Sequence, residues 1–404
     1  MPHRNIDAMI SSMDDEFYRI QRLPPYVFAE VNAMKAAARA RGEDIIDLGM
    51  GNPDGSPPQH VIDKLAEVAN KPHAHRYSAS RGIPGLRKAQ ANYYKRRFNV
   101  DLDADKEVIV CLGSKEGLAN LAQAITAPGD VVLAPNPSYP IHTFGFIIAG
   151  AAIRSIPAAP GDEFFDRLTN AMRYTVPRPK VLVVGYPSNP TAYVADLPFY
   201  ERLVAFAREH ELIVISALAY AEIYFGDEPT PSILQVEGAK EIAVEFTSTS
   251  KTYSMAGWRI GFAVGNARLI DALGRVKSYL DYGAFTPIQA AACAALNGPQ
   301  DIVEANRQLY KKRRDVLVES FGRAGWDIPP PPASMFAWAP IPERFHNIGA
   351  MEFSKKLLTE AQVAVAPGVG FGEQGEGYVR IALVENEQRL RQAARGVKKM
   401  LAAG

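Results

Sequence analysis

Short runs of apolar, β-branched residues alternate with helix-like segments through the middle of the chain. Seven such runs lie between residues 107 and 265: EVIVCLG, DVVLAP, AAIRSIP, KVLVVGYP, ELIVISALAY, EIAVEFTS and RIGFAVG. Segments with helical periodicity, for example KEGLANLAQAI and LPFYERLVAFAREH, separate most of them. Strands that alternate with helices indicate a mainly parallel sheet covered by helices on both faces. We therefore predict an α/β fold with a seven-stranded sheet.

The two ends of the chain follow a different pattern. A proline-marked segment, RLPPYVF, an alanine-rich helical run and the loop DLGMGNPDGSPP precede the alternating region. After about residue 300 come a long charged helix, the stretch PPPPASMFAWAPI, a further helix, the strand YVRIALV and a terminal helix. We predict a large domain over residues 61–299 and a smaller α+β domain over residues 300–404, to which the segment 1–60 also contributes.

The composition favours a globular protein with a large core, since 47% of the 404 residues are hydrophobic and 22% are charged. A formal net charge of +1 gives no support for a nucleic-acid or anionic-membrane partner. No uninterrupted apolar run approaches the ~18–20 residues of a membrane span, and the N-terminal sequence has no apolar signal region. The two cysteines, Cys111 and Cys293, have no CxxC spacing and are expected as buried thiols. We expect a cytoplasmic protein.

One stretch, EFTSTSKTYSMAGWRIGFAVGN, places a lysine between two apolar strands. The first strand ends in a cluster of hydroxyl residues, Lys251 follows it, and Arg259 opens the next strand. A single lysine is normally a solvated surface charge, but here we expect partial desolvation. Desolvation lowers the pKa of a lysine and allows its amine to form a Schiff base with a carbonyl. Arg259 and the hydroxyls of Ser248 and Ser250 are groups that can bind a phosphate.

A second anion site is predicted in VCLGSKEGLANLAQAI, where a strand ends at Gly113 and a helix begins at Ser114. The free N–H groups and the dipole at a helix N-terminus favour a phosphate, and we expect the Ser114 hydroxyl to cap the helix. Many strand-to-helix turns share this pattern, so by itself it is weakly specific. The stretch GVGFGEQG, residues 368–375, does not open a helix after a strand, and we exclude it as a dinucleotide fingerprint.

Two polar residues stand out next to apolar strands. Asn189, in YPSNPTA, follows the strand VLVVG, where a simple turn is the alternative. Arg380 lies within GEGYVRIALV, and a buried guanidinium should meet a carboxylate, which a structural Asp or Glu would also provide. His73 and His75 lack the spacing of a metal motif, so we interpret them as loop histidines and expect no metal.

Together these residues resemble the class I, fold-type I aminotransferases, which depend on pyridoxal 5′-phosphate (PLP). In the lysine signature of that family, a hydroxyl residue lies three positions before the lysine and an arginine eight positions after it. Ser248 and Arg259 have this spacing around Lys251. The resemblance runs over nearly the whole chain. It implies that the large domain binds PLP and that the protein is a homodimer, with contacts from the segment 1–60.

The resemblance also implies which residues bind the cofactor and the substrate. The cofactor-binding residues would be Lys251 as the covalent anchor, Ser114, Lys115, Ser248, Ser250 and Arg259 at the phosphate, Tyr139 stacked on the ring, Asn189 and Tyr220 at the phenolic oxygen, and Tyr77 reaching the phosphate from the partner subunit. The substrate-binding residues would be Arg380 at the α-carboxylate, together with Asn189, Gly51 and Tyr26.

Within the class, RLPPYVF, MGNPDG, GSKEGLANL, NPSYPIH and SKTYSMAGWRIGF look most like bacterial glutamate–pyruvate (alanine) aminotransferases. The LL-diaminopimelate and aspartate aminotransferases are the alternatives. The resemblance implies a ping-pong reaction that moves an amino group between an L-amino acid and a 2-oxo acid. Lys251 would act in it as general base and then as general acid.

One position departs from the family pattern, in the stretch VISALAYAEIYF. The family has an aspartate three residues before the tyrosine that matches Tyr220 and 28 after the asparagine that matches Asn189, and both spacings lead to Ala217. That aspartate pairs with the pyridine nitrogen of the cofactor. Ser216 is not expected to replace it, because neighbouring residues of a strand point to opposite faces. The hypothesis is a protein that binds PLP but transaminates poorly.

Two other classes of protein remain open at this point. A lyase, decarboxylase or racemase on the same fold is one, because some PLP enzymes work without a protonated ring nitrogen. A regulatory or ligand-binding module without enzymatic activity is the other. Analysis of the products separates the enzyme classes, and a cofactor spectrum that does not change with alanine would favour binding without turnover.

Overall fold

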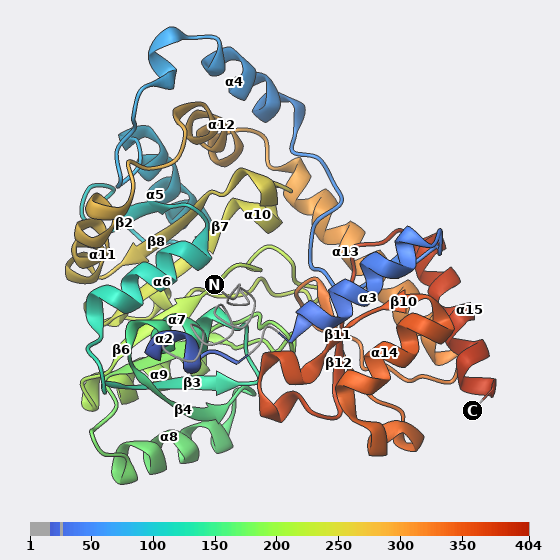
Figure 1. Ribbon diagram of the computed structural model, residues 1–404. Coiled ribbons are helices and arrows are strands. Elements are labelled where there is room, and N and C mark those ends of the chain that lie inside the picture. Colours follow the sequence, from blue (N-terminus) through green and yellow to red (C-terminus); the bar gives the residue numbers. More distant parts are fainter. Residues whose placement is uncertain (1–16, 25–26, 404) are drawn as a thin grey trace, which may run out of the picture.

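The computed structural model describes residues 17–24 and 27–403, and a seven-stranded sheet forms its centre (Figure 1). The strand order is β2-β8-β7-β6-β5-β3-β4. The strands are β2 Val108–Cys111, β3 Val131–Asn136, β4 Ala152–Pro157, β5 Val181–Val184, β6 Ile213–Ala217, β7 Ala243–Ser248 and β8 Gly261–Gly265. Each coincides with one of the predicted apolar runs, and β3 extends one residue beyond its run, to Asn136. Strand β8 is antiparallel to both neighbours and the other pairs are parallel, which confirms the mainly parallel sheet.

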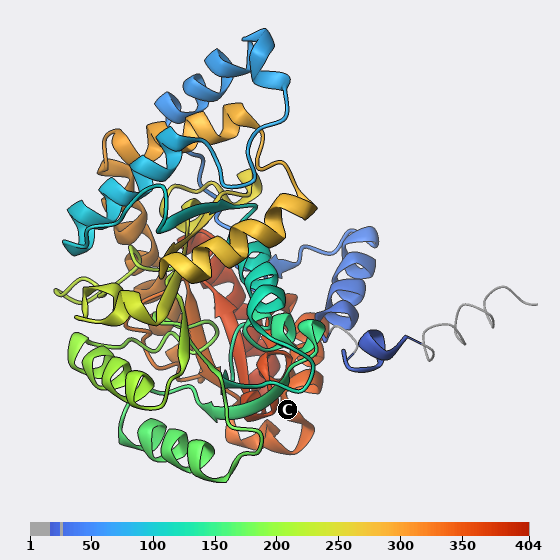
Figure 2. The same cartoon turned by 90° about the vertical axis from the view of Figure 1, so that its left-hand side faces the viewer.

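Helices cover both faces of this sheet, because successive strand residues point in opposite directions. In β6, Val214 and Ile215 belong to two different apolar clusters. The Ile215 side packs against α6 Ser114–Ile125, α7 Ile141–Ala149 and α11 Ala267–Leu280. The Val214 side packs against α5 Pro84–Phe98, α8 Asp162–Tyr174, α9 Leu197–Glu209 and α12 Thr286–Asn297, with α4 Gln59–Ala69 beside α12 (Figure 2).

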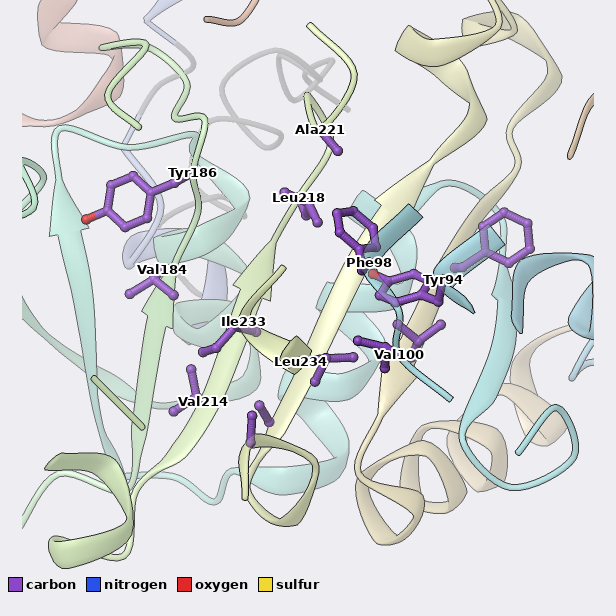
Figure 3. Close-up of a cluster of buried hydrophobic side chains, with 14 of the residues drawn as sticks. Tyr94, Phe98, Val100, Val184, Tyr186, Val214, Leu218, Ala221, Ile233 and Leu234 are labelled. Atoms are coloured by element: carbon purple, nitrogen blue, oxygen red, sulfur yellow. The ribbon is translucent and has the colours of Figure 1, made fainter. Parts of the chain in front are cut away.

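Figure 3 shows part of the cluster on the Val214 side. Val184 and Val214 come from neighbouring strands, and Tyr94 and Phe98 come from α5. All four side chains are buried. This packing leaves the edge formed by the strand ends as the place where polar side chains can gather.

Both ends of the chain contribute to a second, smaller group of strands and helices with its own apolar cluster, which we call the small domain. It has an antiparallel sheet in the order β11-β12-β9 and a parallel pair, β1 with β10. Its strands are β1 Ile46–Asp47, β9 Phe336–Pro340, β10 Val363–Ala364, β11 Ala366–Pro367 and β12 Tyr378–Ala382. Its helices are α3 Phe28–Ala40, α13 Asp301–Gly322, α14 Gly349–Ala361 and α15 Glu387–Ala403. Figure 1 shows α3 beside α14, so distant segments of the sequence meet here.

The two remaining α-helices of the described residues are short: α2 Tyr18–Gln21 and α10 Thr249–Thr252, which follows β7 directly. Cys111 and Cys293 are both free thiols, and Cys111 is fully buried while Cys293 is partly exposed. Within residues 17–24 and 27–403, none of the helices has the length and apolar character required to cross a membrane.

Candidate active site

A cavity of about 300 Å³ lies where the carboxyl ends of β5, β6 and β7 face the small domain. This edge is where open α/β sheets usually bind their ligands. Most of the residues predicted for the site line this one cavity. They are Gly51, Ser114, Lys115, Tyr139, Asn189, Ala217, Tyr220, Ser248, Ser250, Lys251, Arg259 and Arg380.

The two remaining predicted residues are Tyr26 and Tyr77. Tyr26 lies outside the residues that the structure describes. Tyr77 is 86% exposed and its ring lies 4.7 Å from that of Tyr282. Within a single chain Tyr77 therefore does not line its own cavity, and its predicted role in a partner subunit stays a prediction.

Lys251 lies on the short helix α10, and its side chain is partly buried in the cavity. Its Nζ donates a hydrogen bond to the carbonyl oxygen of Gly51 at 2.7 Å. Burial, followed by the positive charges of Arg380 and Arg259, lowers the pKa of the amine from the usual 10.5 to about 8. A large fraction of Lys251 is therefore in the neutral, nucleophilic form near pH 8.

The N-terminus of α6 and Arg259 form one end of the cavity. Gly113 precedes α6 with a φ of +87°, and an ideal Cβ placed on it would lie 2.2 Å from Nη2 of Arg259. A Cβ on Gly261 would lie 2.4 Å from the backbone nitrogen of Ser114. Only glycine fits both places without displacing these groups. The arrangement gives a helix N-terminus and a guanidinium on one side of the cavity, which suits an anion.

The hydroxyl of Ser114 is arranged differently from the prediction, and those of Ser248 and Ser250 form local hydrogen bonds. The hydroxyl of Ser114 does not cap α6, because it donates to the carbonyl oxygen of Thr247 at 2.7 Å. This bond ties the start of α6 to β7 and leaves the first N–H groups of the helix open. Ser248 caps α10 by accepting from the backbone N–H of Ser250 at 3.1 Å, and its hydroxyl is 2.9 Å from that of Ser250.

Arg380 extends from β12 of the small domain into the cavity and is 7% exposed. Its Nη1 donates to Oδ1 of Asn189 at 2.8 Å, and its Nη2 donates to the carbonyl oxygen of Gly49 at 2.8 Å. The guanidinium lies 4.0 Å from the ring centroid of Phe336 and 4.6 Å from that of Phe371. Two aromatic rings and two hydrogen bonds therefore hold this cation in one orientation.

Asn189 connects the two sides of the cavity. Its Oδ1 accepts from Arg380, and its Nδ2 lies 3.5 Å from the phenolic oxygen of Tyr220. Tyr220 is buried and packs edge-on against Phe336. Burial raises the pKa of the Tyr220 phenol, so its hydroxyl keeps its proton and remains a donor at neutral pH.

Ala217 ends β6 on the side of the sheet that faces α7. An ideal Cβ on Gly185 would lie 3.2 Å from the Cβ of Ala217 and 3.3 Å from Cε1 of His142, so these three residues meet. Ser216 points to the other face, where its hydroxyl donates to Oε2 of the buried Glu245 at 2.9 Å. Ser216 is therefore not available to the cavity.

Sequence reasoning did not single out several residues that the cavity contains. His142 belongs to the segment NPSYPIH but carried no signal of its own. Phe336 and Phe371 come from the small domain, and the neighbouring pair Lys35 and Asp47 is joined at 2.7 Å between Nζ and Oδ2. Their positions depend on contacts between distant segments. The apolar run around Phe336 indicates a buried strand, and the spacing of apolar residues in α3 indicates which side of that helix is buried. These two sequence signals are the ones that could have pointed to these residues.

The fold and this arrangement of residues define a family. The family model Aminotransferase class I and II matches residues 43–397, and the chain belongs to that family. Its members use PLP as cofactor.

The chain is also similar to proteins over nearly its whole length. It is 63% identical to the putative aminotransferase AatC of Rhizobium meliloti, with 96% of each chain covered. It is 54% identical to the glutamate-pyruvate aminotransferase AlaC of Escherichia coli, covering 96% of this chain and 94% of AlaC. The substrate-bound structure of BacF from Bacillus subtilis has a TM-score of 0.85 at 34% identity, with 99% and 98% of the two chains covered.

The residues of the cavity fit PLP in charge and in shape. The end formed by Gly113, the N-terminus of α6 and Arg259 suits a phosphate, and a Cβ at Gly113 would fill the cradle. The neutral amine of Lys251 suits the aldehyde of the cofactor. The position at Ala217 is the exception, because an alanine offers no charge to a ring nitrogen.

Proposed function

We propose that the chain is an aminotransferase that moves an amino group between an L-amino acid of the alanine or glutamate type and a 2-oxo acid. We further propose that Ala217 impairs this reaction. The observation that carries the proposal is the cavity itself. It brings together the amine of Lys251, the guanidinium of Arg380 and the anion-binding end at Arg259.

Each of these groups has a distinct task. Lys251 would anchor the cofactor covalently, and its freed Nζ would take the α-proton of the substrate and later return a proton. Arg380 would bind the α-carboxylate through a guanidinium that Asn189 and the two phenyl rings already orient. Arg259, Ser248, Ser250 and the α6 N-terminus would hold the phosphate. When bound, PLP supplies an electron sink for the negative charge that develops on the α-carbon.

Ala217 removes the anion that the family places at the ring nitrogen. A charge-assisted hydrogen bond is worth roughly 1.5–3 kcal/mol, and this one would matter most in the transition state. A rate lower by a factor on the order of 10 to 10² follows, because each ~1.4 kcal/mol corresponds to a factor of ten. The groups that bind the phosphate, the covalent anchor and the α-carboxylate are unaffected, so PLP binding should remain.

The test is to restore the carboxylate. We expect Ala217→Asp to raise kcat for alanine and 2-oxoglutarate by at least about tenfold. Ala217→Asn is the matched control, because it has nearly the same size without the charge. A similar gain in both variants, or no gain in Ala217→Asp, would overturn the proposed impairment. A donor panel that includes glutamate, aspartate and LL-diaminopimelate, run on Ala217→Asp, distinguishes the alanine type from its alternatives.

We also propose that the protein works as a homodimer, with Tyr77 of each subunit reaching the phosphate in the partner's site. The support is that Tyr77 is exposed and does not line the cavity of its own chain. It lies beside further exposed apolar side chains in the segment 279–285.

A further inference from the structure

The part of the cavity that Ala217, Gly185 and His142 line, called the hollow, has one polar side chain in its wall. Ala217 and Gly185 present only small groups to the cavity, and the imidazole of His142 forms the third side. Gly185 follows β5, Ala217 ends β6 and His142 lies on α7, so the hollow is held by the sheet and a helix packed on it.

His142 has an unmet capacity for hydrogen bonding. The residue is 7% exposed, and its Nδ1 is buried without a hydrogen-bond partner among the described residues. Burial lowers the pKa of the imidazole to about 4, so the ring is neutral at pH 7 and carries one N–H donor. An unmet buried polar group destabilises the folded protein, and a suitable ligand would recover that loss.

Ser216 and Glu245 supply no polar group to this part of the cavity. Ser216, the adjacent residue, bonds to Glu245 on the opposite face of the sheet. Glu245 itself is fully occupied there, because it also accepts from the hydroxyls of Tyr94 and Ser232 and lies near the backbone N–H of Ile233. The buried carboxylate of this region therefore points away from the cavity.

We propose that the hollow formed by Ala217, Gly185 and His142 binds a small monocarboxylate, and that formate binds best. The bound anion activates the enzyme and is not consumed. Formate has the same heavy atoms as the carboxyl group by which aspartate differs from alanine. One oxygen would accept from His142, and the anion would supply the charge missing at the position of the ring nitrogen. This inference rests on the proposed function, because it assumes PLP in the cavity.

From the residues around the hollow we predict that it selects ligands by their size and by their charge. A Cβ on Gly185 would lie only 3.2 Å from the Cβ of Ala217, so there is little room between these two residues and a larger ligand should bind less well. We expect half-saturation to rise from formate to acetate and again to propionate. Formamide, which is similar in size but neutral, should not activate, because a neutral ligand cannot pair with a developing positive charge.

The first experiment measures kcat of the holoenzyme with alanine and 2-oxoglutarate as formate is added, with chloride balancing the ionic strength. We expect a saturable increase of at least about tenfold. Ala217→Asp and Ala217→Asn fill the hollow while Arg380 and Arg259 stay in place. Neither variant should respond to formate. An equal response in Ala217→Asn would show that formate acts at another cation and would overturn the proposal.

The second experiment does not depend on turnover. Binding of ¹³C-labelled formate is followed by NMR line broadening, and the visible spectrum of the bound cofactor is recorded in the same titration. We expect formate to perturb both in the original chain and in neither hollow-filling variant. His142→Leu should weaken binding by about tenfold, since it removes the donor. Unchanged binding in His142→Leu would exclude the imidazole as a ligand.

The outcomes separate this inference from the proposed function. If Ala217→Asp does not transaminate any tested pair of substrates, the proposed function fails. If Ala217→Asp is active but formate neither binds nor activates the original chain, only this inference fails. Activation by chloride, formamide and formate alike would indicate an adventitious ion only, and would also overturn it.

Discussion

The surroundings of Lys251 determine the pKa of its side-chain amine. Partial burial and the charges of Arg380 and Arg259 lower its pKa to about 8. The shift has a simple sign: these factors disfavour the protonated form, so the nucleophilic amine forms at a lower pH than in a solvated lysine. The burial of Lys251 and its two neighbouring arginines thus set the pH above which its amine can react with the aldehyde of PLP.

We predict how cofactor-free protein reacts with PLP as the pH changes. The rate at Lys251 should rise up to about pH 8 and then level off, because the amine is already neutral there. The measurement is the growth of visible absorbance after mixing, with Lys251→Ala subtracted for other lysines. A rate that still climbs about tenfold per unit above about pH 9 would mean that Lys251 has an ordinary pKa.

Single residues of the site differed in how far the sequence could predict them. Lys251, Asn189 and Arg380 each follow or lie in a strand, so their positions could be inferred from the pattern of apolar runs. The alternation of β6 correctly placed Ser216 on the face opposite Ala217. His142 could not be predicted, because its importance comes from an unpaired nitrogen that only packing creates. The capping role expected for the Ser114 hydroxyl was wrong, since Thr247 offers a closer acceptor.

At the scale of elements, the turn between β2 and α6 is the most constrained part of the site. Gly113 has a φ of +87°, and a Cβ there would lie 2.2 Å from the guanidinium of Arg259. We predict that Gly113→Ala weakens PLP binding by at least about tenfold, because it displaces Arg259 from the phosphate end. The measurement is a PLP titration of dialysed protein.

The control for Gly113→Ala is Gly129→Ala. Gly129 has nearly the same φ, +89°, but nothing lies within 4 Å of an added Cβ. Both variants should lose about 1–2 kcal/mol in the free energy of unfolding, because alanine is strained in this conformation. Only Gly113→Ala should lose PLP affinity. Equal affinity in both variants would show that contact with Arg259 is not what the glycine protects.

The elements themselves were largely predictable, and the reason is physical. A strand buried on both faces must be apolar throughout, so the seven runs stand out in the sequence. The antiparallel direction of β8 was not predicted, since direction depends on the connection and not on composition. The meeting of α3 with α14, and of β1 with β10, was expected only in outline. Register between distant segments is set by tertiary packing.

At the scale of the whole molecule, exposed apolar side chains gather in two adjacent segments. Tyr77 contacts Tyr282, and the hydroxyl of Ser80 donates to the carbonyl oxygen of Asp281 at 2.5 Å. Within 279–285, Tyr279 is 88% exposed, and Leu280 and Phe285 are exposed as well. A patch of this kind favours a protein partner, and a second copy would also bring Tyr77 to a site.

Subunit mixing tests whether Tyr77 acts in the partner's site. In the Ala217→Asp background, one subunit carries Lys251→Ala and the other Tyr77→Phe. If the two residues act in one shared site, each variant homodimer should be defective at low PLP concentration, whereas the mixed dimer should have one site with both Lys251 and Tyr77. We expect activity at limiting PLP to exceed the mean of the two homodimers severalfold. Activity equal to that mean, with mixed dimers confirmed by differently tagged subunits, would show that Tyr77 does not act across an interface.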